Sequence, residues 1–312
     1  MHTRFVMEHG REPWAILPEA LQAMLASPTV PGIIAGMDAA APGRGRPAAA
    51  TQGAIAVIPI SGPISQKASY WGGTSCAEIG AMLNQALADP SVASILLDIC
   101  SPGGSVYGTP ELAAQVADAN TRKPVVALAN GMCASAAYWI ASQAGELVVS
   151  PSGDVGSIGV FTMHADISKM LADTGIDVTL IKAGKYKAEA NPFAPLDPEA
   201  LAAIQAQVDG YYADFVGAVA RGRNASPSAV RAGFGQGRMV PAKDAVAAGM
   251  ADRVGTFDQT VRRMAAARAA APSARAEEEP APEPPQSPAA PDAVAIMAEI
   301  ETRRRRLNFR RH

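Results

Sequence analysis

The sequence contains few cysteines, and their spacing fits neither of the structural roles that cysteine usually plays. Three cysteines, Cys76, Cys100 and Cys133, are spread over 312 residues. An odd and sparse set without metal-ligand spacing argues against a disulfide framework and against a zinc site. We therefore expect a reducing compartment, no metal and no bound cofactor.

The sequence also lacks a large excess of charge and a long apolar run. Its formal net charge is -2, with 18% charged residues, which implies no whole-chain attraction to nucleic acid or to a membrane. No run approaches the roughly 18 apolar residues of a membrane span. The first ten residues carry charge and lack the apolar stretch of a signal peptide. We expect a cytoplasmic protein without a membrane span.

Short apolar segments that alternate with helical patterns are what the sequence does contain. With 48% hydrophobic residues, the chain can bury a sizeable core. Continuously apolar strands between helices are typical of a mostly parallel sheet covered on both faces, an α/β fold. The patterns predict strands at residues 54–60, 92–99, 125–128, 146–149, 158–163 and 178–181. They predict helices at 12–26, from Thr74 or Ser75, from a cap at Thr109, from Ser135 to Gly145, from Asp166 to Gly175, and from Pro198.

Changes in composition divide the chain into four parts. Residues 1–51 carry the first helix and a linker rich in Ala, Pro, Gly and Arg, and residues 52–265 carry the regular α/β pattern. Residues 266–291 are rich in Ala, Pro and Glu, a composition that cannot bury a core and predicts disorder. Residues 292–312 combine a short apolar stripe with six arginines, which predicts a basic helix or tail.

The stretch around Ser135 carries the clearest candidate chemistry. Ser135 precedes a helix and is surrounded by small residues, so free backbone N–H groups and the positive end of the helix dipole point at whatever binds there. These features suit a serine nucleophile with an oxyanion hole, although an N-cap serine would have the same sequence. Gly103 and Gly104 follow the neighbouring strand and can supply further amides. The glycine at position 105 that a dinucleotide-binding fingerprint needs is replaced by Ser105.

A serine nucleophile needs a base, and the residues leave two choices. Of four histidines, three lie near the ends of the chain, so a Ser-His-Asp triad would have to use His164. The alternative base is a lysine, which can act if burial lowers its pKa. The lysines in the middle of the chain are Lys169, Lys182, Lys185 and Lys187, and each could instead be a solvated surface charge.

Four stretches together resemble the signal peptide peptidase A family of serine-lysine peptidases, whose fold is that of the Clp protease and crotonase superfamily. They are residues 98–104, residues 135–141, residues 156–160 and residues 184–187, and they occur in the order and spacing of the family. The resemblance covers roughly residues 52–255. It implies a mostly parallel sheet with repeated β-β-α units, a peptidase domain at 52–265, and a protein or peptide substrate.

The resemblance also implies roles for particular residues. Ser135 would be the nucleophile, Lys187 the general base, and Ser157 a serine that orients the lysine. Gly103 or Gly104, with the N–H of Ala136, would form the oxyanion hole. The sequence departs from many relatives in having Ala136-Ala137 where they have two glycines, which affects the fit of the substrate more than the chemistry.

The similarity is greatest to the phage branch, the head-maturation or capsid-assembly proteases, because residues 13–20 and 191–193 are similar to that branch. The resemblance implies a homo-oligomer and capsid or scaffold proteins as partners of the C-terminal tail. Two alternatives stay open: a cellular peptidase that degrades signal peptides, and a non-proteolytic scaffold or crotonase-like acyl-CoA enzyme on the same fold.

Overall fold

The computed structural model describes residues 12–26, 50–52, 54–68 and 72–270. The chain divides into two units, residues 1–270 and 271–312, and all of the described residues belong to the first. The predictions for most of the first linker, for the disordered segment from residue 271 onward and for the basic tail therefore lie outside the described residues.

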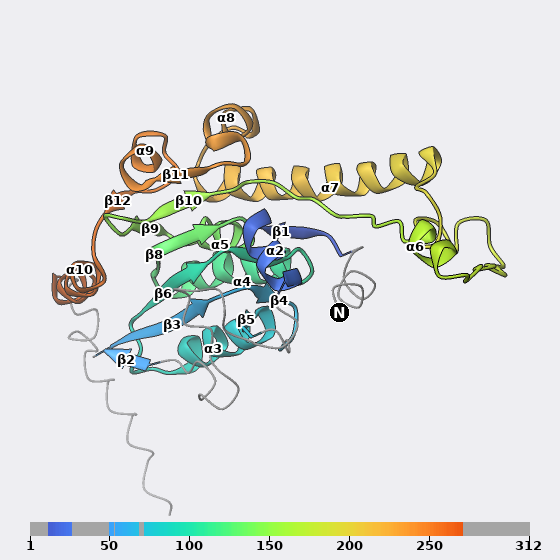
Figure 1. The fold of residues 1–312 in the computed structure, drawn as a ribbon. Helices are drawn as coiled ribbons and strands as arrows, with labels where there is room; N and C mark the ends of the chain where they lie inside the picture. The colour runs from blue at the N-terminus through green and yellow to red at the C-terminus, as the bar shows by residue number, and fades with distance from the viewer. Residues whose placement is uncertain (1–11, 27–49, 53, 69–71, 271–312) are drawn as a thin grey trace, which may run out of the picture. The chain divides into compact units, whose positions relative to one another are not determined.

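A mostly parallel sheet forms the centre of the first unit (Figure 1). Its order is β11-β10-β8-β6-β3-β2; β9 also pairs with β8, and β12 pairs with β9. Only β2 and β11 run antiparallel to their neighbours. The strands are β2 (Ala50–Gln52), β3 (Ile55–Ser61), β6 (Ser94–Ser101), β8 (Val125–Ala134), β9 (Glu146–Val149), β10 (Asp154–Gly156), β11 (Met239–Pro241) and β12 (Arg253–Val254).

A second, smaller sheet lies beyond the carboxyl end of β6, because β7 (Gly103–Ser105) follows that strand after one residue. Its order is β1-β7-β4-β5, with β1 (Trp14–Ile16) antiparallel to β7. The other two strands are β4 (Ile64–Ser65) and β5 (Thr74–Ser75). The N-terminal strand is thereby held against the segment that follows a central strand of the main sheet.

Helices cover both faces of the main sheet. They are α2 (Pro18–Ala26), α3 (Cys76–Ala88), α4 (Thr109–Arg122), α5 (Ala136–Ala141), α6 (Ser168–Asp173), α7 (Pro198–Gly222), α8 (Pro227–Gly233), α9 (Ala242–Ala247) and α10 (Phe257–Ala270), with the 3-10 turn η1 (Gly235–Gly237). In β3, Ile58 and Ile60 pack in the large core with α3, α4, α5 and α7. Ile55 and Val57 face the other way and pack in a cluster with Met264 of α10. This alternation gives the sheet two buried faces, as the sequence predicted.

α6 and the first half of α7 form an extension from this core. We call residues 168–208 the arm: α6, the segment after it, and the first three turns of α7. The segment after α6 has no regular structure before Pro198 and lies at the end of α7 that is remote from the sheet (Figure 1). The second half of α7 is packed into the core, where Phe215 stacks on Trp139 with ring centroids 4.5 Å apart.

Several boundaries predicted from the sequence are confirmed. β3, β6 and β9 form where continuous apolar runs predicted strands, although β6 begins two residues later. Ser75 caps α3 through a reciprocal capping box with Glu78, and α7 begins at Pro198 after the cap Asp197. The mixed α/β architecture with a mostly parallel sheet is therefore confirmed.

Other local predictions are wrong. Residues 12–26 are not one helix: Trp14–Ile16 form β1, and α2 begins at Pro18, where proline favours the first turn. Thr109 does not cap the helix that begins there, because its hydroxyl donates to Ser105 O. The N-cap position is taken by Gly108, which has a left-handed conformation. The helix after Ser135 ends at Ala141 and not near Gly145.

Two of the predicted strands do not form. Residues 158–163 are extended, but only Phe161 makes a β-bridge, with Trp14. Residues 178–181 have no regular structure and are exposed, with Ile181 at 98%. An apolar run becomes a strand only where a neighbouring strand pairs with it, and the described residues offer this run none. Residues 103–105, for which no strand was predicted, pair with β1 and β4 and form β7.

Candidate active site

Ser135 stands at the end of β8 in a strained backbone conformation. Its φ is 54° and its ψ is -116°, values that non-glycine residues rarely adopt and that cost about 1–3 kcal/mol. Its N–H donates to Gly156 O at 2.7 Å, and Trp139 N donates to Ser135 O at 2.9 Å as α5 begins. The residue occupies the N-cap position, yet its side chain accepts no capping hydrogen bond. Its Oγ donates to Gly159 O at 3.4 Å, so this hydroxyl is not used to cap the helix.

Ser157 lies beside Ser135 at the end of the adjacent strand. β10 and β8 are parallel with Gly156 opposite Ala134, so the next residue of each strand is one of the two serines. Ser157 also has a positive φ, 51°, and is 6% exposed. Its N–H donates to Arg238 O at 2.9 Å. Two strained, buried serines at one edge of a sheet are the kind of backbone outlier that clusters at functional sites.

The glycine strand β7 passes directly beside Ser135. A Cβ built on Gly103 would lie 2.9 Å from Ser135 Cβ, and a Cβ on Gly104 would lie 1.8 Å from Ile64 O, so side chains are excluded at both positions. The Gly103 N–H donates to Ser101 Oγ at 3.2 Å. Among the described residues, no acceptor is assigned to the N–H of Ala136, the first residue of α5. That amide and the β7 backbone are the groups that could stabilise an oxyanion near Ser135.

The structure does not bring Lys187 to Ser135. Lys187 is exposed in the arm, and its backbone N–H donates to Gly184 O at 3.3 Å. Its neighbour Lys185 is engaged elsewhere, with its Nζ 2.8 Å from Glu199 Oε1. Of the predicted site residues, Ser135, Ser157, Gly103, Gly104 and Ala136 therefore lie together, while the predicted base does not contact them within one copy.

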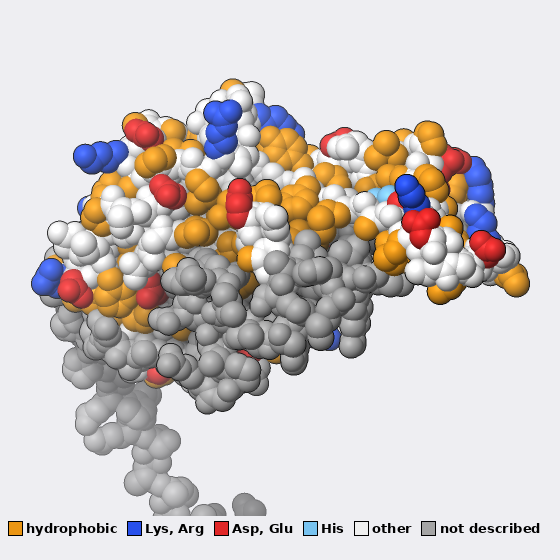
Figure 2. Space-filling view, viewed as in Figure 1, with side chains coloured by type: hydrophobic (Ala, Val, Ile, Leu, Met, Phe, Trp, Pro, Cys, Tyr) orange, Lys and Arg blue, Asp and Glu red, His pale blue; other side chains and the backbone are white. Residues whose placement is uncertain are grey.

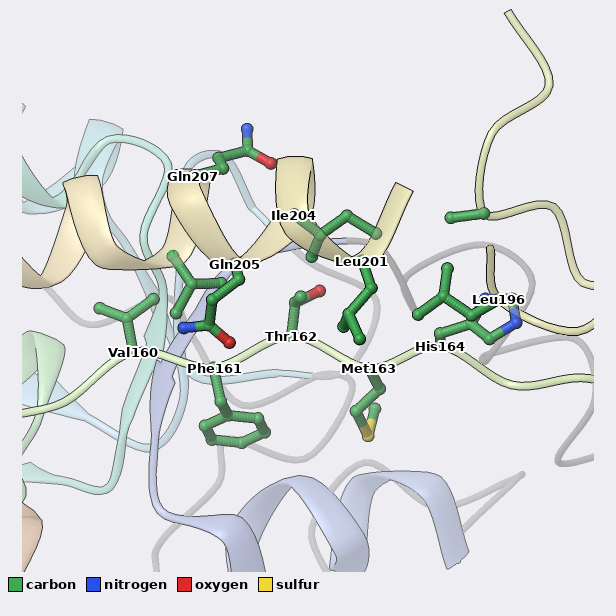
Figure 3. A pocket seen from close by; sticks show the side chains of 12 residues that line it. Val160, Phe161, Thr162, Met163, His164, Leu196, Leu201, Ile204, Gln205 and Gln207 are labelled. Atoms are coloured by element: carbon green, nitrogen blue, oxygen red, sulfur yellow. The ribbon is translucent and has the colours of Figure 1, made fainter. Parts of the chain in front are cut away.

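His164 does not contact Ser135 either. It lines a pocket of about 290 Å³ between residues 160–164 and α7, together with Leu196, Leu201 and Ile204 (Figure 3). Its Nε2 is buried and has no hydrogen-bond partner among the described residues. The hydroxyl of Ser135 donates to Gly159 O, so the geometry provides no Ser135–His164 pair.

Cys133, two residues before Ser135, is not a competing nucleophile in this environment. Its side chain is fully buried, and burial raises the pKa of the thiol well above its usual range. Because the thiolate is the reactive form of cysteine, a raised pKa makes the residue inert.

Two contributors to the site were not predicted. Ser101 donates its hydroxyl to Gly62 O at 2.7 Å while accepting from the Gly103 amide, and so fixes the start of β7. The N-terminal strand β1 pairs with β7 beside Ser135. Pro18 was the signal for β1, because a proline in the first turn of a helix places the preceding residues outside it.

The described residues contain neither a metal-binding cluster of His, Cys, Asp and Glu side chains nor a membrane-spanning helix. No group of three or more His, Cys, Asp or Glu side chains within them could hold a metal ion. No helix among the same residues is long and apolar enough to cross a membrane.

Comparisons with known proteins point to a peptidase family. Residues 117–271 match the family model described as peptidase family S49. The chain is 32% identical over 243 residues to head-tail preconnector protein GP5 of Enterobacteria phage P21, which covers 76% of this chain and 48% of that protein. It is 38% identical over 159 residues to capsid assembly protease C of Escherichia phage lambda, covering 50% and 36%.

A third relative matches over most of its own length. The chain is 30% identical over 216 residues to the Synechocystis sp. protein slr0021, covering 69% of this chain and 74% of that protein. By contrast, the chain spans about half or less of the two phage relatives. The match region 117–271 contains Ser135, Ser157 and Lys187.

Proposed function

Because the chain belongs to peptidase family S49, we propose that it is a serine endopeptidase in which Ser135 attacks the peptide carbonyl. The observation that carries the proposal is the Ser135 geometry: a strained residue at a strand end whose hydroxyl caps no helix and lies beside a glycine strand. A hydroxyl used only for structure at an N-cap would bond the first turn of α5.

The reaction follows from the groups around Ser135. The Ser135 Oγ adds to the carbonyl carbon as a base removes its proton, and the resulting oxyanion is held by backbone amides of β7 and of Ala136. The C–N bond then breaks, the base returns its proton to the leaving amine, and an acyl-enzyme remains. Water, activated by the same base, hydrolyses the ester and restores Ser135.

We assign the base to Lys187, as the resemblance implies, with Ser157 orienting its ammonium group. A neutral lysine is needed, and enclosure in an apolar site favours that form. In one copy the arm holds Lys187 exposed and away from Ser135. The dyad is therefore completed when the arm moves or when a second copy supplies it.

The surface of the arm supports association between copies. Most of the exposed large hydrophobic side chains among the described residues belong to it: Met170, Ile176, Val178, Leu180, Ile181, Tyr186 and Leu201, each between 42% and 98% exposed. Figure 2 shows hydrophobic side chains gathered along the outer part of α7 and around α6. Apolar patches of this kind mark interaction sites.

We expect a homo-oligomer in solution. Light scattering at micromolar concentration should give a mass several times that of one chain, because the apolar arm surface is removed from water on assembly. Replacing Ile181 with aspartate should shift the mass toward one chain, whereas Lys182→Ala, at a neighbouring exposed position, should not. A monomeric mass for the unchanged protein would contradict the proposal.

A covalent probe tests the activity itself. The full chain should react with a fluorophosphonate probe, and peptide mass spectrometry should place the label on Ser135. Labelling at another serine would mean that Ser135 is not the nucleophile, whereas a well-folded chain that hydrolyses no peptide and takes up no label would favour the scaffold alternative. A crotonase-like acyl-CoA enzyme would instead bind acyl-CoA, which can be measured by calorimetry.

For the biological role we propose capsid assembly in a phage or prophage, with capsid or scaffold proteins as partners. The names of the P21 and lambda relatives support this role. The neighbouring genes test it: portal and major capsid genes beside this one would support it. Their absence would favour the alternative of a cellular signal peptide peptidase.

A further inference from the structure

The N-terminal strand occupies a slot between two segments of the proposed active site. On one side it pairs with β7, where Trp14 lies opposite Ser105 and Ile16 opposite Gly103. On the other side, Trp14 N donates to Phe161 O at 2.8 Å, and Phe161 N donates to Trp14 O at 3.0 Å. β1 is thus the middle strand between the glycine strand and the segment that follows Ser157.

This slot is immediately beside the proposed nucleophile. A Cβ built on Gly103 would lie 2.2 Å from Ala15 O and 2.9 Å from Ser135 Cβ, so the Ala15 carbonyl and the nucleophile flank the same glycine. The Ala15 side chain is fully buried and belongs to the same core cluster as Ala136. Residue 15 therefore lies next to the proposed nucleophile.

Contacts before and after β1 hold the strand in register. Leu17 N donates to Pro102 O at 2.9 Å, and Val106 N donates to Pro13 O at 3.0 Å. Ser105 Oγ donates to the Glu12 carboxylate, and Thr162 Oγ1 donates to Glu12 O at 3.2 Å. Every one of these partners belongs to β7, to its flanks, or to residues 161–162.

An extended peptide can bind a protein by adding a strand to an exposed sheet edge. The space between β7 and residue 161 holds one strand at a time, so β1 and a bound peptide would compete for it. From this we infer that residues 12–17 are an internal occupant of the peptide-binding slot, which must withdraw before Ser135 can meet a substrate. The inference rests on the proposed function. We call residues 12–17 the strap. The strap is not aligned for attack in this state, since Ser135 Oγ donates to Gly159 O and the proposed base is absent from the site.

Only Ala15 of β1 belongs to the main core, so withdrawal of the strap would leave most of that core in place. Trp14 and Ile16 pack with Ala20 and Leu21 of α2 in a small cluster that is separate from the main core. Phe161 and Met163 complete this cluster, and both point toward α2, whereas Thr162 points toward α7 (Figure 3). Segments held by small satellite clusters open at lower free energy than the core does.

Binding of a labelled peptide to the full-length protein tests the strap. The probe is a fluorescein-labelled hexapeptide with the sequence of residues 12–17, Glu-Pro-Trp-Ala-Ile-Leu, and the readout is fluorescence anisotropy. Ala15→Glu places a carboxylate at a fully buried position and should expel the strap, and Glu12→Ala removes the contact with Ser105. Glu19→Ala, at an exposed position of α2, is the matched control.

The expected result is that Ala15→Glu binds the peptide about tenfold or more tightly than the unchanged chain, because an occluded site loses apparent affinity in proportion to its closed fraction. Glu12→Ala should give a smaller gain, and Glu19→Ala none. Glu12→Ala carries the test alone if Ala15→Glu does not fold. Equal binding by Glu12→Ala, Glu19→Ala and the unchanged chain would overturn the inference.

Fluorophosphonate labelling of the same variants separates this inference from the proposed function. If peptide binding differs among the variants but none is labelled at Ser135, the slot and its strap stand and the nucleophile is wrong. If all variants are labelled at the same rate and bind the peptide equally, the nucleophile stands and the strap is wrong.

Discussion

Replacing Ser135 with alanine should abolish peptide hydrolysis while leaving the fold intact. The loss in kcat should be on the order of 10⁴-fold or more, because the nucleophile of a covalent mechanism cannot be replaced by its neighbours. The cost to stability should be below about 1 kcal/mol, since the hydroxyl makes one long hydrogen bond, 3.4 Å, and caps no helix. Hydrolysis of casein and of a short fluorogenic peptide measures the first effect, and thermal unfolding the second.

Two variants serve as controls for this prediction. Ser142→Ala removes a hydroxyl from the other end of α5, where it donates to Trp139 O, and should keep its activity. Cys133→Ala should keep it too, because burial holds that thiol in its inert form. Proteolysis by Ser135→Ala at the level of the unchanged protein would refute the assignment of the nucleophile.

Replacing Lys187 with alanine should reduce activity about as much as replacing Ser135, because the two members of a dyad act as a unit. Lys182→Ala and Lys185→Ala are matched controls two to five residues away, and both should retain most of the activity. His164→Ala should cost little. Initial rates on a short peptide, measured with equal amounts of folded protein, check all four variants.

The pH profile adds a second readout for the base. A lysine accepts a proton only when it is neutral, so the rate should rise with pH between about 6 and 9. A profile that only falls over this range, or an essential His164 with a dispensable Lys187, would mean that the mechanism is a triad.

Mixing two inactive variants tests where the base comes from. If a second copy supplies the arm, Ser135→Ala and Lys187→Ala chains should together recover part of the activity, since some pairs combine an intact Ser135 with an intact Lys187. If the arm moves within one copy, the mixture should stay inactive.

The parts of the fold that the sequence predicted are those decided by local rules. The helix starts predicted at Thr74 or Ser75 and at Pro198 depend on caps whose hydrogen bonds form within three residues, so a short stretch of sequence is sufficient to find them. The apolar runs of β3 and β9 are only seven and four residues long, which is too short for a buried helix. Their continuous apolar character therefore indicates strands that are buried on both faces.

The parts that the sequence missed depend on distant partners. Trp14–Ile16 become a strand because β7, about ninety residues later, pairs with them. Residues 178–181 are also apolar, but none of the described strands pairs with them, and they stay irregular. Local propensity does not separate the two cases, since residues 178–181 contain the more β-branched residues, and long-range pairing decides between them.

The same distinction applies to the candidate site. Its small neighbours made Ser135 a candidate, the family resemblance gave Ser135 and Ser157 their roles, and the pairing of β8 with β10 brings the two serines side by side. Lys187 lies exposed in the arm, and no local pattern in the sequence indicates this position. The roles of Ser135, Ser157 and Lys187 remain predictions until the variants are measured.

Helix α10 limits how much of the chain that follows the main sheet can be removed without exposing an apolar face of that sheet. Its residues Phe257, Val261 and Met264 cover a face of the sheet made by β3, β6, β8 and β9, including Leu96 and Leu128. A cut after residue 270 would leave that cover in place. A cut before Phe257 would strip the cover and expose a flat apolar face, and the product should aggregate rather than survive as a smaller protease.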